Sequence, residues 1–221
     1  MSLPIPVTLC LFRHGRTTWN VLGKYQGQTD TELDDLGRAQ ARAVGMRCRE
    51  MNPVALYTSD LQRCRDVAEQ VQTLTGIEVV ADVRLRETDF GAWSGHTRAE
   101  IADLFAEEYK AWRAGDQDVR PGGTGESQKM LRTRVTGFVD SIRERHESGL
   151  VVAVSHAAWI RNMARWVLGT DGSPNLGTPS QGSLTVITLG NEHHTLETYN
   201  DRGHLLSMSP ADQETHTPAV Y

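Results

Sequence analysis

Short apolar runs alternate along the chain with longer stretches in which apolar residues recur every three or four positions. Six runs have the length and composition of strands, namely residues 7–12, 55–58, 77–83, 150–154, 183–189 and 195–199. The run at 150–154 is apolar throughout, which is typical of an interior strand of a parallel sheet. The last two runs flank Gly190 and Asn191, so they predict a hairpin-like pair.

Helices are predicted in the periodic stretches between most of these strands. They cover residues 33–51, 59–74, 97–112, 126–147 and 157–168. Ser59 and Asp60 are expected to form the N-cap of the second helix. Strands that alternate with helices indicate an α/β fold. The polar, glycine-rich residues 115–125 predict a flexible connection or lid rather than a domain linker.

Arg13, His14 and Gly15 follow the first predicted strand directly. Open α/β sheets bind their ligands at the carboxyl ends of strands, so these residues occupy a favourable position for a site. A guanidinium beside an imidazole suggests an anion site, because arginine donors match the oxygens of phosphate or carboxylate. The alternative is a surface turn that contains these residues by chance.

A second histidine and a second arginine occupy equivalent positions. His156 ends the apolar run at 150–154, and small residues and a helix follow it. Arg63 lies in the first turn of the helix after the second strand, where backbone donors and the helix dipole favour an anion. One such residue is ordinarily a buried or solvated structural residue, but four at equivalent strand ends favour a functional site.

Composition narrows the class of protein. A net charge of −5 argues against a general nucleic-acid surface and favours a small substrate. Cys10, Cys48 and Cys64 show neither a disulfide framework nor zinc-finger spacing. The first apolar run is too short for a signal sequence or a membrane span, so a cytoplasmic protein without membrane association is expected.

The 221 residues are predicted to form one domain at 1–200, followed by a polar, loosely ordered arm at 201–221. The sequence leaves the oligomeric state open, with a homodimer among the options.

Five motifs occur in an order that spans most of the chain. They are Arg13-His14-Gly15, Gln26-Gly27, Arg63 after Ser59-Asp60-Leu61, Leu85-x-Glu87 with Phe90-Gly91 and Trp93, and Ser155-His156. Together they resemble the histidine phosphatase superfamily in its phosphoglycerate mutase-like branch. The resemblance implies a three-layer α/β/α sandwich on a mostly parallel six-stranded sheet with one strand reversed. It also implies a phosphohistidine intermediate, no metal and no other cofactor.

The resemblance assigns a role to each site residue. His14 would be the nucleophile, while Arg13, Arg63 and His156 would hold the phosphoryl oxygens. Glu87 would protonate the leaving oxygen and then activate water, with Asp89 as the fallback acid. Further contacts to a small phosphate ester would come from Asn20, Gln26, Gly27 and the backbone N–H of Ala157.

Within the superfamily, Glu87-Thr88-Asp89-Phe90-Gly91 replaces the Glu-Arg-His-Tyr-Gly usual in mutases, which favours a phosphatase over a phosphoglycerate mutase-type phosphotransferase. The stretches 26–33 and 84–88 are also similar to actinobacterial glucosyl-3-phosphoglycerate phosphatases, which suggests a sugar or glycerate phosphate as substrate. Two other classes compete. A metallohydrolase is disfavoured because arginines beside both histidines would repel a cation, and an inactive phospho-ligand sensor because nucleophile, acid and arginines are all present.

Two departures from the usual pattern concern the pocket. Residues 122–125 carry two extra positions before Glu126 and Ser127, so a different pocket rim is expected. Ala157 and Ala158 stand where glycines are common, and a backbone contact to phosphate then requires negative φ. Negative φ is expected because a helix begins there.

Overall fold

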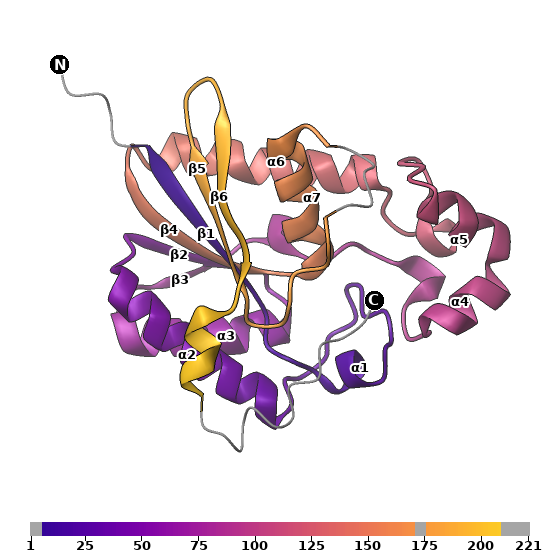
Figure 1. The fold of residues 1–221 in the computed structure, drawn as a ribbon, viewed down its shortest axis with the longest axis horizontal. Helices are drawn as coiled ribbons and strands as arrows, with labels where there is room; N and C mark the ends of the chain where they lie inside the picture. The colour runs from indigo at the N-terminus through magenta and orange to yellow at the C-terminus, as the bar shows by residue number, and fades with distance from the viewer. Residues whose placement is uncertain (1–5, 171–175, 209–221) are drawn as a thin grey trace.

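A six-stranded sheet in the order β3-β2-β4-β1-β5-β6 forms the centre of the computed structural model, which describes residues 6–170 and 176–208 (Figure 1). The strands are β1 Val7–Arg13, β2 Ala55–Thr58, β3 Val79–Ala81, β4 Gly149–Ser155, β5 Leu184–Leu189 and β6 His194–Asp201. The first four are parallel, and β5 is antiparallel to both of its neighbours. The mostly parallel sheet with one reversed strand is therefore confirmed.

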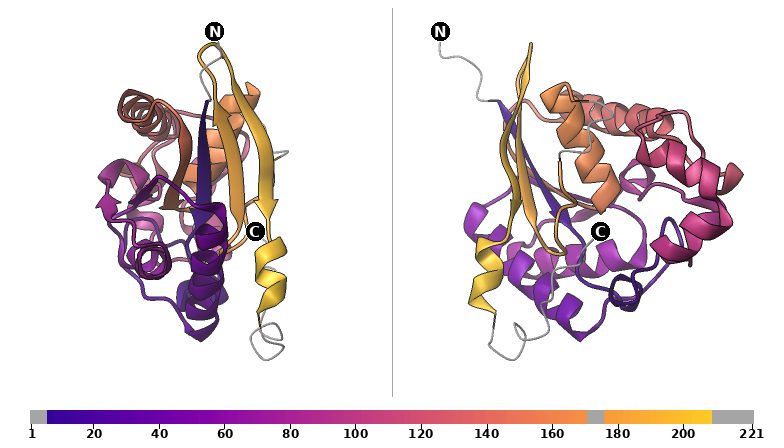
Figure 2. Two further views of the ribbon diagram at one scale, coloured as in Figure 1. Left: turned by 90° about the vertical axis from the view of Figure 1, so that its left-hand side faces the viewer. Right: turned by 45° about the vertical axis from the view of Figure 1, so that its right-hand side comes forward.

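Helices cover both faces of the sheet (Figures 1 and 2). The helices are α1 Thr18–Val21, α2 Asp35–Met51, α3 Gln62–Thr75, α4 Arg98–Leu104, α5 Ala106–Arg113, α6 Gln128–Arg145 and α7 Ala157–Leu168. One face carries α2 and α3, and the other carries α6 and α7, which makes the three layers. In contrast, α4 and α5 stand apart from the sheet at the right of Figure 1.

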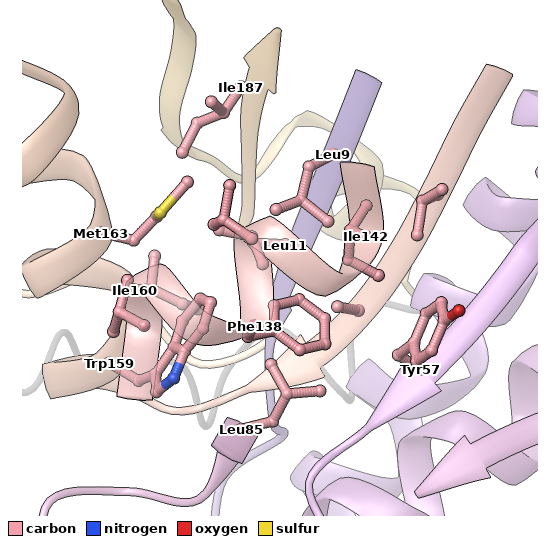
Figure 3. Packing of buried hydrophobic residues seen from close by; sticks show 14 of the residues in the cluster. Leu9, Leu11, Tyr57, Leu85, Phe138, Ile142, Trp159, Ile160, Met163 and Ile187 are labelled. Atoms are coloured by element: carbon pink, nitrogen blue, oxygen red, sulfur yellow. The ribbon is translucent and has the colours of Figure 1, made fainter. Parts of the chain in front are cut away.

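The central strand β1 is apolar from Leu9 to Phe12 because both of its faces are buried. Leu9 and Leu11 point to the α6/α7 face, whereas Cys10 and Phe12 belong to the α2/α3 face. Figure 3 shows Leu9 and Leu11 packed among side chains that include Trp159. The polar residues Arg13 and His14 follow at the carboxyl end of the strand.

The predicted helix at 97–112 is two helices. Phe105, at φ −129° and ψ 43°, ends α4 and precedes α5. Its ring lies 6.3 Å from that of Trp93. Together with Ile101 and Tyr109 these rings form a small apolar cluster separate from the two faces of the sheet. The break lets both short helices cover this cluster.

The N-cap prediction for the second helix is wrong. The helix α3 begins at Gln62, and its N-cap residue Leu61 makes no side-chain cap. Asp30 from a distant loop instead accepts from the Gln62 N–H at 2.7 Å. Ser59 and Asp60 serve other partners, since the Ser59 hydroxyl contacts a histidine and Asp60 pairs with Arg86.

The end of the glycine-rich segment, residues 121–125, is a packed turn, whereas residues 115–120 are half-buried or exposed and the predicted flexible connection or lid stays a prediction there. Gly122 adopts φ +61°, and a Cβ there would lie 2.2 Å from the backbone N of Ala92. The Glu126 N–H donates to Asp89 O at 2.7 Å, which closes the segment onto the loop after β3. None of residues 122–125 lines the pocket described below, so the two extra positions do not form its rim.

The other boundaries differ modestly. The third strand pairs only over Val79–Ala81, and the sixth helix begins at Gln128 after a Ser127 cap. The C-terminal arm starts with a short 3-10 helix, Gly203–Ser207, in which Leu205 is buried. The rest of the predicted arm, residues 209–221, lies outside the described residues, and the domain boundary stays a prediction.

Candidate active site

The two histidines that follow strand ends lie side by side at the carboxyl edge of the sheet. β1 and β4 are parallel neighbours whose register pairs Arg13 with Ser155. The N–H of His14 continues this ladder and donates to Ser155 O at 3.0 Å. The ring centroids of His14 and His156 are 5.1 Å apart. The sheet therefore joins two polar segments from opposite ends of the chain.

His14 is 2% exposed and holds a defined tautomer. Its Nδ1 lies 2.7 Å from Gly15 O. A carbonyl oxygen only accepts, so Nδ1 carries the ring proton and Nε2 keeps its lone pair. Burial, followed by the charges of Arg63 and Arg13, lowers the pKa of His14 well below its ordinary value. A neutral imidazole with an unprotonated Nε2 is the form that can attack an electrophile.

His156 is the N-cap residue of α7, makes no side-chain cap and is fully buried. Its Nε2 lies 2.9 Å from Ser59 Oγ and 3.3 Å from Cys64 Sγ. Burial, followed by the charge of Arg63, lowers the pKa of His156 well below its ordinary value. Burial also raises the pKa of the Cys64 thiol, which therefore stays protonated. The loop after β2 and the start of α3 thus fix a neutral ring against His14.

Arg13 and Arg63 are buried cations held by backbone carbonyls. Arg13 donates to Pro179 O at 2.7 Å, and Arg63 donates to Gly27 O at 2.8 Å and Thr29 O at 2.9 Å. The Nε atom of each arginine is buried without a hydrogen-bond partner among residues 6–170 and 176–208. Both arginines also line the pocket described below, where their positive charge favours an anion.

Glu87 is 8% exposed and lies at the start of α7. Its Oε2 accepts from the Ala158 N–H at 3.2 Å, and its Oε1 accepts from the Thr88 N–H at 2.9 Å. Asp89, in contrast, accepts from the Gly91 N–H at 2.9 Å and does not line the pocket. Glu87 therefore lines the pocket, whereas Asp89 closes its own turn.

Arg134 fixes the segment that carries Glu87. Its Nη1 donates to Arg84 O at 2.7 Å and to Arg86 O at 2.9 Å, and its Nη2 donates to Glu87 O at 3.3 Å. The same guanidinium pairs with both carboxylate oxygens of Glu126, at 2.7 and 2.6 Å. The sequence did not predict these hydrogen bonds of Arg134, because an arginine inside a helix gives no sign that it binds a distant loop.

The loop after β1 supplies the predicted polar contacts. The side-chain oxygen Oδ1 of Asn20 accepts hydrogen bonds from the Thr17 N–H and hydroxyl, which closes the capping box of α1. The side-chain oxygen Oε1 of Gln26 accepts a hydrogen bond from the Thr31 hydroxyl at 2.6 Å, so the side-chain NH₂ is the group left for a ligand. Gly27 has φ +54°, the left-handed region that favours glycine, and a Cβ there would lie 3.2 Å from the Phe90 N.

Ala157 and Ala158 have negative φ, as expected, because α7 begins at Ala157. The first residues of a helix have N–H groups without an intrahelical acceptor. Ala158 uses its N–H on Glu87, whereas Ala157 lines the pocket and its N–H has no hydrogen-bond acceptor among residues 6–170 and 176–208. A single backbone donor and the positive end of α7 are thus presented there.

One pocket of about 140 Å³ joins almost all of the predicted residues. Its lining includes Arg13, His14, Asn20, Gln26, Gly27, Arg63, Glu87 and Ala157. His156 is the exception, because it is fully buried behind His14 and does not reach the lining.

The outer part of the same pocket was not predicted. It is lined by Lys24, Tyr25, Phe90, Arg98, Trp112, Arg113, Ala158, Arg161 and Thr178. Tyr25 packs edge-on against Phe90 at 5.0 Å, and burial raises its pKa to about 12. Arg161 could have been found, since it follows Ala157 by four residues and so shares its helix face. Residues from α4 and α5 could not, because no local pattern says where those helices pack.

Neither a metal-ligand cluster nor a membrane-spanning helix occurs in the part of the chain that the structure describes. Within the part of the chain that the structure describes, no three His, Cys, Asp or Glu side chains come together as a metal site would require. In the same residues, no helix combines the length and the apolar character that crossing a bilayer demands.

Comparison with known proteins agrees with this geometry. Residues 9–202 match the model of the histidine phosphatase superfamily, branch 1. Glucosyl-3-phosphoglycerate phosphatase of Mycobacterium tuberculosis is 39% identical over 195 residues, which cover 81% of this chain and 84% of that protein. Phosphoserine phosphatase 1 of Hydrogenobacter thermophilus is 33% identical over 165 residues, covering 75% of this chain and 78% of that protein.

The fold has counterparts among solved structures. A mycobacterial glucosyl-3-phosphoglycerate phosphatase in complex with VO3 superposes with a TM-score of 0.80 at 32% identity, covering 88% of this chain and 99% of that one. Since the family model spans most of the chain and the sheet carries both histidines at its carboxyl edge, this protein belongs to the histidine phosphatase superfamily and is a phosphatase.

Proposed function

We propose that the protein hydrolyses phosphomonoesters of small metabolites through a phosphohistidine on His14, without a metal ion. The observation that carries this proposal is the placement of His14. Its neutral ring, with Nε2 unprotonated, lines the same pocket as the buried cations Arg13 and Arg63, whose charges act on it. A nucleophile and an anion site at one point are what phosphoryl transfer requires.

In the first step, His14 Nε2 attacks the phosphorus while the ester P–O bond breaks. The Nδ1–H···O bond to Gly15 becomes stronger as the ring gains positive charge, which stabilises the product. Arg13, Arg63 and the Ala157 N–H hold the phosphoryl oxygens, and His156 supports the His14 ring from behind. Fixed charges of this kind do the work that a metal ion does in other phosphatases.

Glu87 handles the proton. Its carboxyl group lies at the same end of α7 as the predicted phosphate position. It donates a proton to the departing alcohol oxygen in the first step. In the second step water attacks phosphorus, Glu87 takes the water proton, and the N–P bonding pair returns to His14. The enzyme is then restored, and phosphate is released.

The substrate is proposed to be a sugar or glycerate phosphate, with glucosyl-3-phosphoglycerate as the first candidate. The similarity to phosphatases of that name supports this choice. The cationic lining of the outer pocket, Lys24, Arg98, Arg113 and Arg161, supports an acidic substrate. A phosphoglycerate mutase-type transfer is the alternative, and a product analysis with 3-phosphoglycerate separates the two, since hydrolysis releases inorganic phosphate and a mutase returns an isomer.

The direct test is to trap the intermediate. Protein quenched in alkali during turnover of an aryl phosphate should carry one acid-labile phosphoryl group, found on His14 by mass spectrometry. His14→Ala should lose the label and at least about 10⁴-fold in kcat, as expected when a nucleophile is removed. His193→Ala, an exposed histidine in the β5–β6 turn, is the matched control and should label normally.

Turnover should also continue in a strong chelator. A label on another residue, or activity lost on chelation and restored by zinc or magnesium, would refute this mechanism.

A further inference from the structure

A second hollow of about 110 Å³ opens beside the catalytic pocket. The two share three lining residues, Trp112, Arg113 and Arg161. The second hollow is otherwise lined by side chains of α6, α7 and the segment after α5. None of the residues assigned to phosphoryl transfer reaches it, so it is a separate space that a long substrate could enter.

Arginine dominates this second hollow. Arg113, Arg132, Arg161 and Arg165 line it, and Asp116 is the one acidic residue among its described lining residues. Such a surplus of guanidinium groups in a concave space attracts anions and repels cations.

The two shared arginines are not neutralised. Among residues 6–170 and 176–208, no carboxylate lies within 4.0 Å of the guanidinium nitrogens of Arg113 or Arg161. Arg161 donates only to the Thr178 hydroxyl, at 3.3 Å, and is half-buried. Arg132 is held in place by Asn162 Oδ1 at 2.7 Å. The residues shared by the two hollows therefore carry positive charge that can bind an anionic group of a ligand.

The helix α7 connects the two spaces. Ala157 lines the catalytic pocket, Arg161 lines both, and Arg165 lines only the second hollow. These residues are four apart, so they follow one helix face. At about 1.5 Å per residue, Arg161 and Arg165 lie about 6 and 12 Å along the axis from the Ala157 N–H. A ligand that spans this distance could have its phosphate at His14 and a second charge among the arginines.

We propose that the second hollow is an oxyanion subsite that binds a second acidic group, a carboxylate or phosphate, of the same substrate molecule, about 6 to 12 Å from the phosphorus. The inference rests on the proposed function, because it takes the scissile phosphate to be at His14. It narrows the substrate class to phosphate esters with a remote acid. In a 3-phosphoglycerate two carbon atoms separate the ester oxygen from the carboxyl carbon, so that acid would meet Arg161, at the near end of the subsite, rather than Arg165.

A pair of synthetic substrates tests the subsite. One is phenyl phosphate with a para-carboxyethyl group, and the other is the same compound with the acid converted to its carboxamide. The wild-type protein should have a kcat/KM about tenfold higher for the acid than for the amide, as one charged arginine contact provides. Arg113→Met and Arg161→Met should each bring this ratio towards one, and raised salt should lower it.

Three further variants locate the anion. Arg165→Met changes only the second hollow and should lower the ratio, whereas Lys24→Met changes only the catalytic pocket and should leave it above fivefold. Arg49→Met, an exposed residue near the end of α2, is the matched control and should keep the wild-type ratio. A wild-type ratio near one, or a ratio that falls in Lys24→Met but not in Arg165→Met, would overturn the subsite. Failure to hydrolyse either compound would instead count against the proposed function.

Discussion

The pocket has two parts that are built differently. The inner part consists of Arg13, His14, Arg63 and Glu87, with His156 behind them, and all five are between 0% and 8% exposed. In the outer part, the four cations Lys24, Arg98, Arg113 and Arg161 and the ring of Trp112 are half-buried or exposed. The inner residues stand at strand ends, helix starts and the loop fixed by Arg134, whereas the outer ones come from a loop, from α4 and α5, and from the flank of α7.

We expect this difference in burial to separate the residues that act on the phosphoryl group from those that select the rest of the substrate. The inner arginines are held by backbone carbonyls, so their positions depend on the fold and not on the ligand. The outer cations have few fixed partners, and substitutions there need not disturb the sheet. We therefore expect inner variants to affect every phosphate ester and outer variants to affect only those with suitable further groups.

The largest expected effect concerns Glu87, in the inner part of the pocket. Glu87→Gln keeps the size of the side chain but cannot donate a proton, so kcat on sugar or glycerate phosphates should fall by about 10²-fold or more. An aryl phosphate should lose less in single-turnover phosphorylation of His14, because a phenolate leaves without a proton. Rapid-quench measurement of that step checks the difference. Asp89→Asn is the control, and equal losses on both substrates would move the acid elsewhere.

The next effect compares the two parts directly. Arg63→Met should lower kcat/KM about tenfold to hundredfold for every phosphate ester, since it removes a charged contact to the phosphoryl group itself. Arg113 lines both hollows, and Arg113→Met should lower kcat/KM only for esters with another acidic group. Arg65→Met, on the exposed side of α3, should match the wild type. The division fails if Arg113→Met weakens simple aryl phosphates as strongly as Arg63→Met does.

The smallest effect concerns stability. Burial depresses the pKa of His14 and His156, so below about pH 6.5 the unfolded chain binds protons that the folded chain does not. Their contribution is therefore complete above that pH and is lost as the pH falls. Each histidine should lower the free energy of unfolding as the pH falls below about 6.5, with a slope of at most about 1.4 kcal/mol per pH unit, the limit for one proton.

Urea unfolding at several pH values measures this slope. In His14→Asn the slope should be smaller than in the wild type, by up to about 1.4 kcal/mol per pH unit, whereas His193→Asn, at an exposed position, should keep the wild-type slope. An unchanged slope in His14→Asn would mean that this histidine titrates normally in the folded protein.

The inner part was within reach of sequence reasoning because it depends on order along the chain. Apolar runs fix where the strands end, and parallel strands bring their carboxyl ends to one edge. His14 and His156 were therefore expected to meet, and their rings lie 5.1 Å apart. The sheet with one reversed strand followed from the resemblance rather than from periodicity.

The outer part was out of reach because it depends on contacts between distant segments. No periodicity in 97–112 showed that Phe105 would break the helix, because the break is caused by packing around Trp93. The cap of α3 was misplaced for a similar reason. Asp30 reaches its N-terminus from another loop and leaves Ser59 for His156, a choice that only the folded neighbourhood determines.

The position of β1 in the middle of the sheet has a consequence for biosynthesis. The strand β1, which ends at Arg13 just before His14, is translated before the other strands of the sheet, yet it lies between β4 and β5, which contain residues 149–155 and 184–189. Its hydrogen-bond partners are thus made after β2, β3 and the helices between β1 and β4 have been translated. Such long sequence separation slows folding, because the loops must close before the contacts form. His14 is therefore synthesised early, but its surroundings are completed late, when β4 and β5 pair with β1.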